Sequence, residues 1–174
     1  LDELGQAIID AALSAFGRVD VVISNAGNQR NGAFGELSDE DMDQVYAVHL
    51  KGAVNVCQPA YREMARQGYG RLVLVGSQSG IFGNPFRANY GAAKTALVGL
   101  MNVIAQEAPE GIAVNTLFPN AGGGRLGNAA ENRPDTEFLA AALERYQHYA
   151  EGMAPEFVVP LAVFMASRQC NTSQ

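Results

Sequence analysis

The chain has 174 residues, of which 48% are hydrophobic and 17% are charged, and its formal net charge at pH 7 is -6. This length and composition predict one globular domain, and the acidic balance argues against binding to a nucleic-acid backbone. No apolar run approaches the roughly 20 residues of a membrane-spanning helix. The two cysteines, Cys57 and Cys170, form no C-x-x-C pair that would indicate zinc. We therefore expect a cytoplasmic protein that binds neither nucleic acid, nor membranes, nor a metal ion.

Helical and strand patterns alternate along the chain. The helical segments repeat hydrophobic residues every three or four positions, whereas the strands are short apolar runs of the kind that is buried on both faces of a sheet. Gly17 is placed to end the first helix, and Ser38, with Asp41 three residues later, is placed to cap the second. Gly52 and Pro59 are expected to bend that second helix. The expected helices cover 4–16, 38–67 and 88–108, and the expected strands cover 19–23, 71–76 and 112–118.

This alternation predicts an α/β fold of the Rossmann type, a parallel sheet with helices on both faces. Ligands of such sheets bind beyond the carboxyl ends of the strands. No strand precedes the first helix, and three apolar strands would leave a hydrophobic edge facing water. We therefore expect 1–174 to be a single domain that is incomplete at both ends, with its N-terminal part missing. The Gly- and Asn-rich stretch and the helix within 121–151 are expected to form a mobile substrate loop.

Three polar residues are expected to meet at the carboxyl ends of these strands. Tyr90 and Lys94 are four residues apart in a helical segment, so their side chains share one face. A tyrosine titrates near pH 10, so acting as a base near pH 7 requires its pKa to fall by about three units, or roughly 4 kcal/mol. An ammonium group about 4 Å away stabilises a phenolate by around 4 kcal/mol at an effective dielectric constant near 20, so one lysine has an effect of the required order. Ser77 ends a strand, where its hydroxyl could meet the same substrate oxygen. The alternative is an ordinary exposed helical pair and a strand-end hydroxyl.

Two segments contain these residues, Gly76-Ser77-Gln78-Ser79-Gly80 and Asn89-Tyr90-Gly91-Ala92-Ala93-Lys94. In residue types and spacing they resemble the active-site signature of the short-chain dehydrogenases/reductases. Ser24-Asn25-Ala26-Gly27 resembles the family's Asn-Asn-Ala-Gly turn beside the cofactor. Gly111-Ile112-Ala113-Val114-Asn115, followed by Pro119, resembles the family's later strand and nicotinamide-side loop. The similarity runs from about Phe16 to Pro119.

The resemblance implies an enzyme that uses NAD or NADP to interconvert a secondary alcohol and a ketone in a small-molecule substrate. In such an enzyme Tyr90 would be the acid/base, Lys94 would support its ionisation and hold the nicotinamide ribose, and Ser77 would orient the substrate oxygen. The hydride chemistry belongs to the cofactor. The cofactor-binding residues that the resemblance implies are Asn25, Ala26, Gly27, Val48, Tyr90, Lys94, Pro119, Asn120 and Ala121.

Within the family, three segments resemble the dehydrogenase unit of the peroxisomal-type multifunctional enzymes that act on (3R)-hydroxyacyl-CoA, which makes a 3-hydroxyacyl thioester a candidate substrate. They are Val48-His49-Leu50-Lys51-Gly52, Ile81-Phe82-Gly83-Asn84 and Pro119-Asn120-Ala121-Gly122. His49 stands where the wider family usually has a catalytic Asn that helps to hold a relay water. Since imidazole can also donate or accept a proton, His49 is a candidate catalytic residue. The alternative is that it makes one structural hydrogen bond.

Other features leave alternatives open. Gly122, Gly124 and Gly127 match G-x-G-x-x-G, but prolines flank them and no later strand follows, so we reject a dinucleotide fingerprint there. The family's phosphate loop is expected upstream of the first residue, as is the segment that determines whether the protein binds NAD or NADP.

Three residues depart from the family's usual pattern. Ser24, Asn120 and His49 favour the alternative of a catalytically silent Rossmann-type binding or regulatory module. The two long helices resemble those of the family's dimer interfaces, so we expect a homodimer or homotetramer.

Overall fold

The computed structural model describes residues 2–120 and 154–173. Its elements in chain order are α1 (Asp2–Phe16), β1 (Val21–Ser24), α2 (Asp39–Tyr46), the π-helical turn η1 (Ala47–Lys51), α3 (Gly52–Gln67), β2 (Gly70–Val75), α4 (Gln78–Phe82), α5 (Ala88–Glu107), β3 (Ile112–Leu117), the 3-10 turn η2 (Pro155–Val158) and α8 (Val159–Ala166). The expected substrate loop over 121–151, with Ala121 and the rejected glycine motif, lies outside the described residues. No helix in the described part of the chain has both the length and the apolar character needed to cross a membrane.

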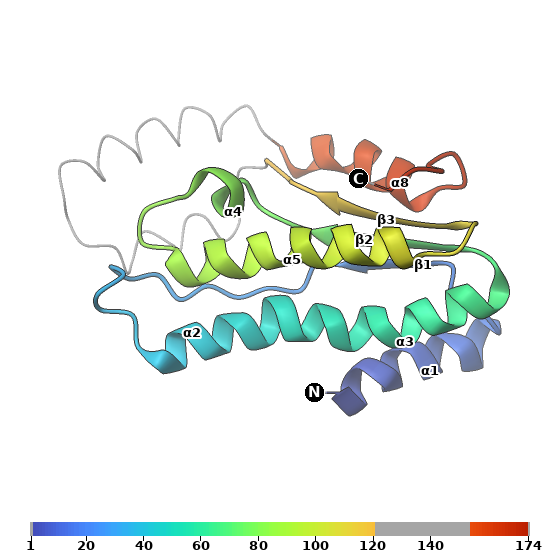
Figure 1. The fold of residues 1–174 in the computed structure, drawn as a ribbon, viewed down its shortest axis with the longest axis horizontal. Coiled ribbons are helices and arrows are strands. Elements are labelled where there is room, and N and C mark those ends of the chain that lie inside the picture. Colours follow the sequence, from blue (N-terminus) through green and yellow to red (C-terminus); the bar gives the residue numbers. More distant parts are fainter. Residues whose placement is uncertain (1, 121–153, 174) are drawn as a thin grey trace.

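The three strands form a parallel sheet in the order β1-β2-β3. Helices α3 and α5 pack against one face and α8 against the other (Figure 1). This arrangement confirms the predicted α/β fold with helices on both faces. Apolar side chains from the sheet and from α1, α3 and α5 make the core, with Ile9, Val22, Cys57, Ala60, Met64, Leu72, Leu74, Met101 and Val114 among its buried members.

The helix ends follow the signals in the sequence. Gly17, with φ at 71°, ends α1 in the left-handed conformation that glycine adopts readily. At the start of α2, the Ser38 hydroxyl accepts the Asp41 backbone N–H at 3.1 Å, and the Asp41 carboxylate accepts the Ser38 backbone N–H at 3.2 Å. Helical structure then continues through η1 and α3, with the π-helical turn directly before Gly52 and with Pro59 inside α3.

The prediction that the first strand is buried on both faces is wrong in the described structure. Val22 is buried, but Val21 and Ile23 are 37% and 47% exposed. Within the described residues β1 pairs only with β2, so it forms an edge of the sheet. Val21 and Ile23 point to the face opposite to Val22, and α8 covers this end of that face only in part. The hydrophobic edge that the sequence led us to expect is therefore present.

Two helices were not anticipated. The five-residue α4 is too short to show a helical repeat of hydrophobic residues. The sequence of α8, Val-Pro-Leu-Ala-Val-Phe-Met-Ala, is apolar throughout, so it has no polar face against which a period could be recognised.

Gly5 allows the close approach of α1 to α3. A β-carbon at this position would overlap the backbone carbonyl of Asn55, and this part of the α3 backbone cannot move without disturbing its own helix. We expect Gly5→Ala to lower the free energy of unfolding by about 1–3 kcal/mol. Gly99→Ala is the matched control, because a β-carbon there meets no atom of the described residues within 4 Å, and it should raise the free energy of unfolding by about 0.5–1 kcal/mol. Urea unfolding measures both, and equal effects would contradict this packing.

Candidate active site

Ser77 lies between β2 and α4, and α4 packs closely on the helix that carries Tyr90 and Lys94. The Thr95 hydroxyl on α5 donates a hydrogen bond to the Gly80 carbonyl on α4. A β-carbon on Gly91 would approach the Ser79 carbonyl oxygen to 3.1 Å. Small residues thus bring the two helices together and hold the carboxyl end of β2 beside α5.

The Ser77 side chain caps α4. Its hydroxyl oxygen accepts the Ser79 backbone N–H at 3.2 Å. Because the oxygen is the acceptor in this contact, the hydroxyl proton remains available to donate to another oxygen. Ser77 is half-buried, at the strand end where the sequence led us to expect it.

Tyr90 and Lys94 are neighbours on α5, as their spacing predicts. The Lys94 ammonium lies 5.7 Å from the centroid of the Tyr90 ring and donates a hydrogen bond of 2.5 Å to the Val75 carbonyl, two residues before Ser77. Lys94 is only 4% exposed. Burial disfavours the ammonium form and lowers the pKa of Lys94 to about 8. The site therefore contains a buried amine that stays largely charged at neutral pH.

His49, on the π-helical turn η1, packs against the same phenol. The two ring centroids are 5.1 Å apart at an interplanar angle of 87°, an edge-to-face arrangement. The His49 Nε2 lies 2.8 Å from the Asn28 carbonyl oxygen and 3.2 Å from the Asn28 backbone nitrogen. Burial lowers the pKa of His49 and the Lys94 charge adds to this, while the Asn28 hydrogen bond opposes it. On balance these effects favour the neutral form of the imidazole.

Sequence reasoning missed two buried residues within the three positions before Tyr90, namely Arg87 and Asn89. The Arg87 guanidinium carbon lies 5.9 Å from the Tyr90 ring centroid, so a second cation faces the phenol. The Asn89 amide donates to the backbone carbonyls of Arg30 and Asp41, and its oxygen accepts the Tyr90 backbone N–H at 2.7 Å. Asn89 thereby fixes the start of α5 against the loop after β1 and against α2. The only available signal was its position inside the Asn89–Lys94 segment.

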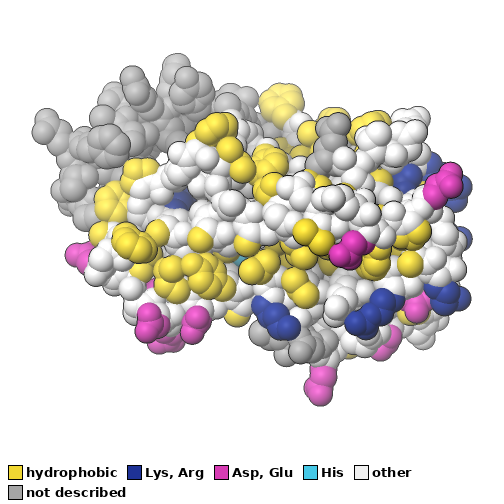
Figure 2. Space-filling model, viewed as in Figure 1, with side chains coloured by type: hydrophobic (Ala, Val, Ile, Leu, Met, Phe, Trp, Pro, Cys, Tyr) yellow, Lys and Arg dark blue, Asp and Glu magenta, His cyan; other side chains and the backbone are white. Residues whose placement is uncertain are grey.

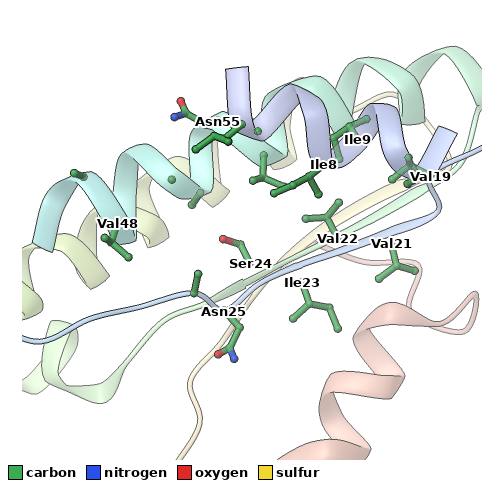
Figure 3. Close-up of a pocket in the computed structure, with 18 residues that line it drawn as sticks. Ile8, Ile9, Val19, Val21, Val22, Ile23, Ser24, Asn25, Val48 and Asn55 are labelled. Atoms are coloured by element: carbon green, nitrogen blue, oxygen red, sulfur yellow. The ribbon is translucent and has the colours of Figure 1, made fainter. Parts of the chain in front are cut away.

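The turn after β1 borders an open pocket of about 560 Å³ between α1, β1 and the η1–α3 segment. In Figure 3, Ser24 and Asn25 lie between Val48 on one side and the apolar side chains of Ile8, Ile9 and Val19 on the other. Asn25 and Ala26 also line the pocket. Candidate cofactor residues from two distant segments therefore share one cavity.

The remaining candidates follow the same edge of the sheet. Pro119 and Asn120 follow β3 after one intervening residue, and Pro119 is half-buried whereas Asn120 is exposed. Since the strands are parallel, the residues after β1, β2 and β3 lie at one edge of the sheet. Tyr90 contacts Lys94 and His49 directly, whereas Ser77 is connected to them through the packing of α4 on α5.

Comparison with known proteins gives the family. Residues 3–133 match the model of the family described as short chain dehydrogenase. The chain belongs to the short-chain dehydrogenase family, which confirms the resemblance seen in the motifs around Ser77 and Tyr90.

Individual relatives agree with this assignment. The chain is 38% identical over 170 residues to peroxisomal multifunctional enzyme type 2 of Mus musculus, covering 97% of this chain and 21% of the relative. It is 39% identical over 118 residues to acetoacetyl-CoA reductase of Acinetobacter, covering 67% of this chain and 48% of the relative. Among solved structures, NAD+-bound xylitol dehydrogenase superposes with a TM-score of 0.71 at 30% identity, covering 75% of this chain and 51% of that one. The chain thus spans between 21% and 51% of the length of these proteins.

Proposed function

We propose that the protein is an NAD- or NADP-dependent oxidoreductase that interconverts a secondary alcohol and a ketone, and that its substrate is a 3-hydroxyacyl thioester. The observation that carries the proposal is the buried Lys94 ammonium, 5.7 Å from the Tyr90 ring centroid, in a chain of the short-chain dehydrogenase family. The names of two relatives, a peroxisomal multifunctional enzyme and an acetoacetyl-CoA reductase, support the thioester.

The roles of the side chains follow from their chemistry. In the reductive direction, the Tyr90 phenol donates its proton to the substrate oxygen as the carbonyl becomes an alkoxide. The Ser77 hydroxyl donates a hydrogen bond to the same oxygen, since its own oxygen is already an acceptor for Ser79. The Lys94 charge favours the phenolate that remains after proton transfer. In the oxidative direction the same groups act in reverse.

The residues at this edge of the sheet fit a nicotinamide cofactor. The pocket beside Asn25, Ala26 and Val48 has a volume of about 560 Å³, and the buried Lys94 amine lies next to the proposed acid/base. We propose that these residues, with Gly27, Tyr90, Pro119, Asn120 and Ala121, hold the cofactor, and that Lys94 donates to its ribose hydroxyls. The cofactor would supply or accept the hydride.

We also propose that the protein assembles as a homodimer or homotetramer through α3 and α5. A groove of about 330 Å³ runs between these helices, lined by Val54, Cys57, Gln58, Tyr61, Arg62, Leu100, Ile104 and Glu107. Nearby on α5, Val103 is 53% exposed. Figure 2 shows hydrophobic side chains gathered on this face between α5 and the helices below it.

Two further expectations remain predictions, namely that residues 1–174 form a single domain and that the protein is cytoplasmic. The mouse relative is named as a peroxisomal enzyme.

Ser77→Ala tests the hydrogen bond to the substrate oxygen. We expect kcat/KM to fall about 10²- to 10³-fold, as is typical when one such donor is removed. Loss of the helix cap should lower the free energy of unfolding by only about 1 kcal/mol. Ser77→Thr keeps a hydroxyl and should retain most of the activity. Steady-state kinetics on both variants measure this, and a Ser77→Ala enzyme as active as Ser77→Thr would contradict the role.

The proposed function is tested by titrating the full-length protein with NADH and NADPH, and by following cofactor oxidation with acetoacetyl-CoA and with simple ketones. We expect binding of at least one cofactor and faster turnover of the thioester than of the ketones. Cofactor binding without turnover of any carbonyl compound would favour the catalytically silent module instead.

A further inference from the structure

Gly27 and His49 are packed so closely that glycine is required. A β-carbon built on Gly27 would lie 2.5 Å from the His49 Cε1, 3.3 Å from its Nδ1 and 3.4 Å from its Nε2. Contacts between carbon atoms are normally no closer than about 3.5 Å. The His49 ring therefore occupies the space of any side chain at position 27.

The ring cannot easily turn away, because it is held on two other sides. Its Nε2 is bonded to the backbone of Asn28, the residue directly after Gly27, and its edge meets the Tyr90 ring at 87°. His49 is also 4% exposed, so the surrounding side chains leave it little free space. One rigid ring thus connects the turn after β1 with the phenol on α5.

We propose that His49 is a positioning residue that couples the Asn25–Gly27 turn to the Tyr90 phenol, with Gly27 as the residue that admits its ring. This role rests on the proposed function, in which that turn holds the cofactor and Tyr90 exchanges a proton with the substrate. A change in the position of the turn would then shift the phenol, so cofactor binding and proton transfer are linked through the imidazole.

The surroundings of His49 favour positioning over a proton relay. A relay through the imidazole requires the ring to accept a second proton in passing. Lys94 and Arg87 both place positive charge around the Tyr90 ring that His49 contacts, and burial lowers the pKa of His49. The Nδ1 atom is buried and has no hydrogen-bond partner among the described residues, so nothing there stabilises a proton on it. The neutral ring acts through its shape and its Nε2 contact.

A double-mutant cycle tests the coupling, with Gly27→Ala, His49→Asn and the double variant made in the full-length protein. An Asn side chain ends before the position of the imidazole Cε1, so it removes the atom that the new methyl group would strike. Gly35→Ala is the matched control, because a β-carbon there meets nothing within 4 Å in the part of the chain that the structure describes. The readouts are kcat and KM with acetoacetyl-CoA, the dissociation constant of NADH, and the free energy of unfolding.

We expect Gly27→Ala alone to lower kcat about 10- to 100-fold, since small misplacements of reacting groups have effects of this size. In the His49→Asn background the same change should cost less than about threefold, because interacting sites are not additive. Gly35→Ala should leave kcat unchanged. Equal effects of Gly27→Ala in both backgrounds would overturn the coupling, since the methyl group would then act on the cofactor directly.

The pH dependence of kcat distinguishes a positioning role of His49 from a proton relay. Turnover by the wild-type protein shows whether a negative result contradicts this role alone or the proposed function as well. His49→Asn should lower kcat without moving the acidic limb of the pH–kcat profile, whereas loss or displacement of that limb would overturn positioning in favour of an ionising relay. A wild-type protein without turnover would overturn the proposed function and this role together. An active wild-type protein with additive variants would overturn this role alone.

Discussion

Tyr90→Phe is expected to lower kcat/KM about 10²- to 10⁴-fold, the range that general acid/base groups contribute. The change removes one hydroxyl and leaves the ring, so the edge-to-face contact with His49 and the nearby cations Arg87 and Lys94 are retained. The free energy of unfolding should therefore change by no more than about 0.5 kcal/mol. Steady-state kinetics and urea unfolding of the same preparation measure the two quantities.

Tyr69→Phe is the matched control for this variant. Tyr69 directly precedes β2 at its amino end, opposite to the candidate site, and its ring contacts Arg71 and Arg168. Phenylalanine keeps those ring contacts, so activity should be that of the wild type. If Tyr90→Phe retains most of the activity, or if both variants lose it equally, Tyr90 does not exchange the substrate proton.

Lys94→Met is expected to lower kcat/KM about 10²- to 10³-fold, the typical effect of removing one stabilising charge from an active site. The variant should also bind NADH and NADPH more weakly, because the proposed donor to the ribose hydroxyls is lost. Titration with each cofactor, beside steady-state kinetics, separates the two effects. Wild-type affinity together with wild-type kcat would remove Lys94 from the site.

The same variant should be more stable than the wild type. Burial lowers the pKa of Lys94 from 10.5 to about 8, so the folded protein holds this proton more weakly than the unfolded chain does. At about 1.4 kcal/mol per pKa unit, burial of the ammonium form costs the wild type about 3.5 kcal/mol. The variant avoids this cost but loses the hydrogen bond to Val75, which stabilises the wild type by about 1 kcal/mol. We therefore expect Lys94→Met to raise the free energy of unfolding by about 2.5 kcal/mol at neutral pH.

The pH dependence of this gain has a definite sign. The cost of burying the charge is fully present below about pH 8, shrinks as the pH rises from about 8 to 10.5, and is absent above that range. The stability difference between Lys94→Met and the wild type should follow the same course, measured by urea unfolding at several pH values. A variant less stable than the wild type at pH 7 would contradict this account of the buried amine.

Local signals were sufficient to predict most elements and part of the site. The distance of four residues places Tyr90 beside Lys94 on any helix, and Ser77 follows an apolar run that ends as a strand must. The capping pair Ser38 and Asp41 fixed the start of α2 in the same way. Each of these inferences depends on residues that are close together in the chain.

Features that depend on packing between distant segments could not be predicted. The contact of Gly27 with His49 joins residues 22 positions apart and depends on how η1 lies against the turn after β1. The burial of Arg87 beside the Tyr90 ring is equally a product of the fold, because arginine is usually exposed. The sequence predicts an exposed hydrophobic edge of the sheet, but it does not indicate that β1 forms this edge, because that depends on the order of the strands.

Transfer of deuterium tests the central claim most directly. NADH or NADPH carrying deuterium on the transferred position of the nicotinamide would be mixed with the full-length protein and acetoacetyl-CoA, and the product analysed by mass spectrometry. We predict that the 3-hydroxyacyl thioester formed by the wild type carries the deuterium at its hydroxyl-bearing carbon, and that Tyr90→Phe forms almost none of this product. A wild-type product without deuterium, or equal labelled product from both proteins, would contradict hydride transfer at a site built on Ser77, Tyr90 and Lys94.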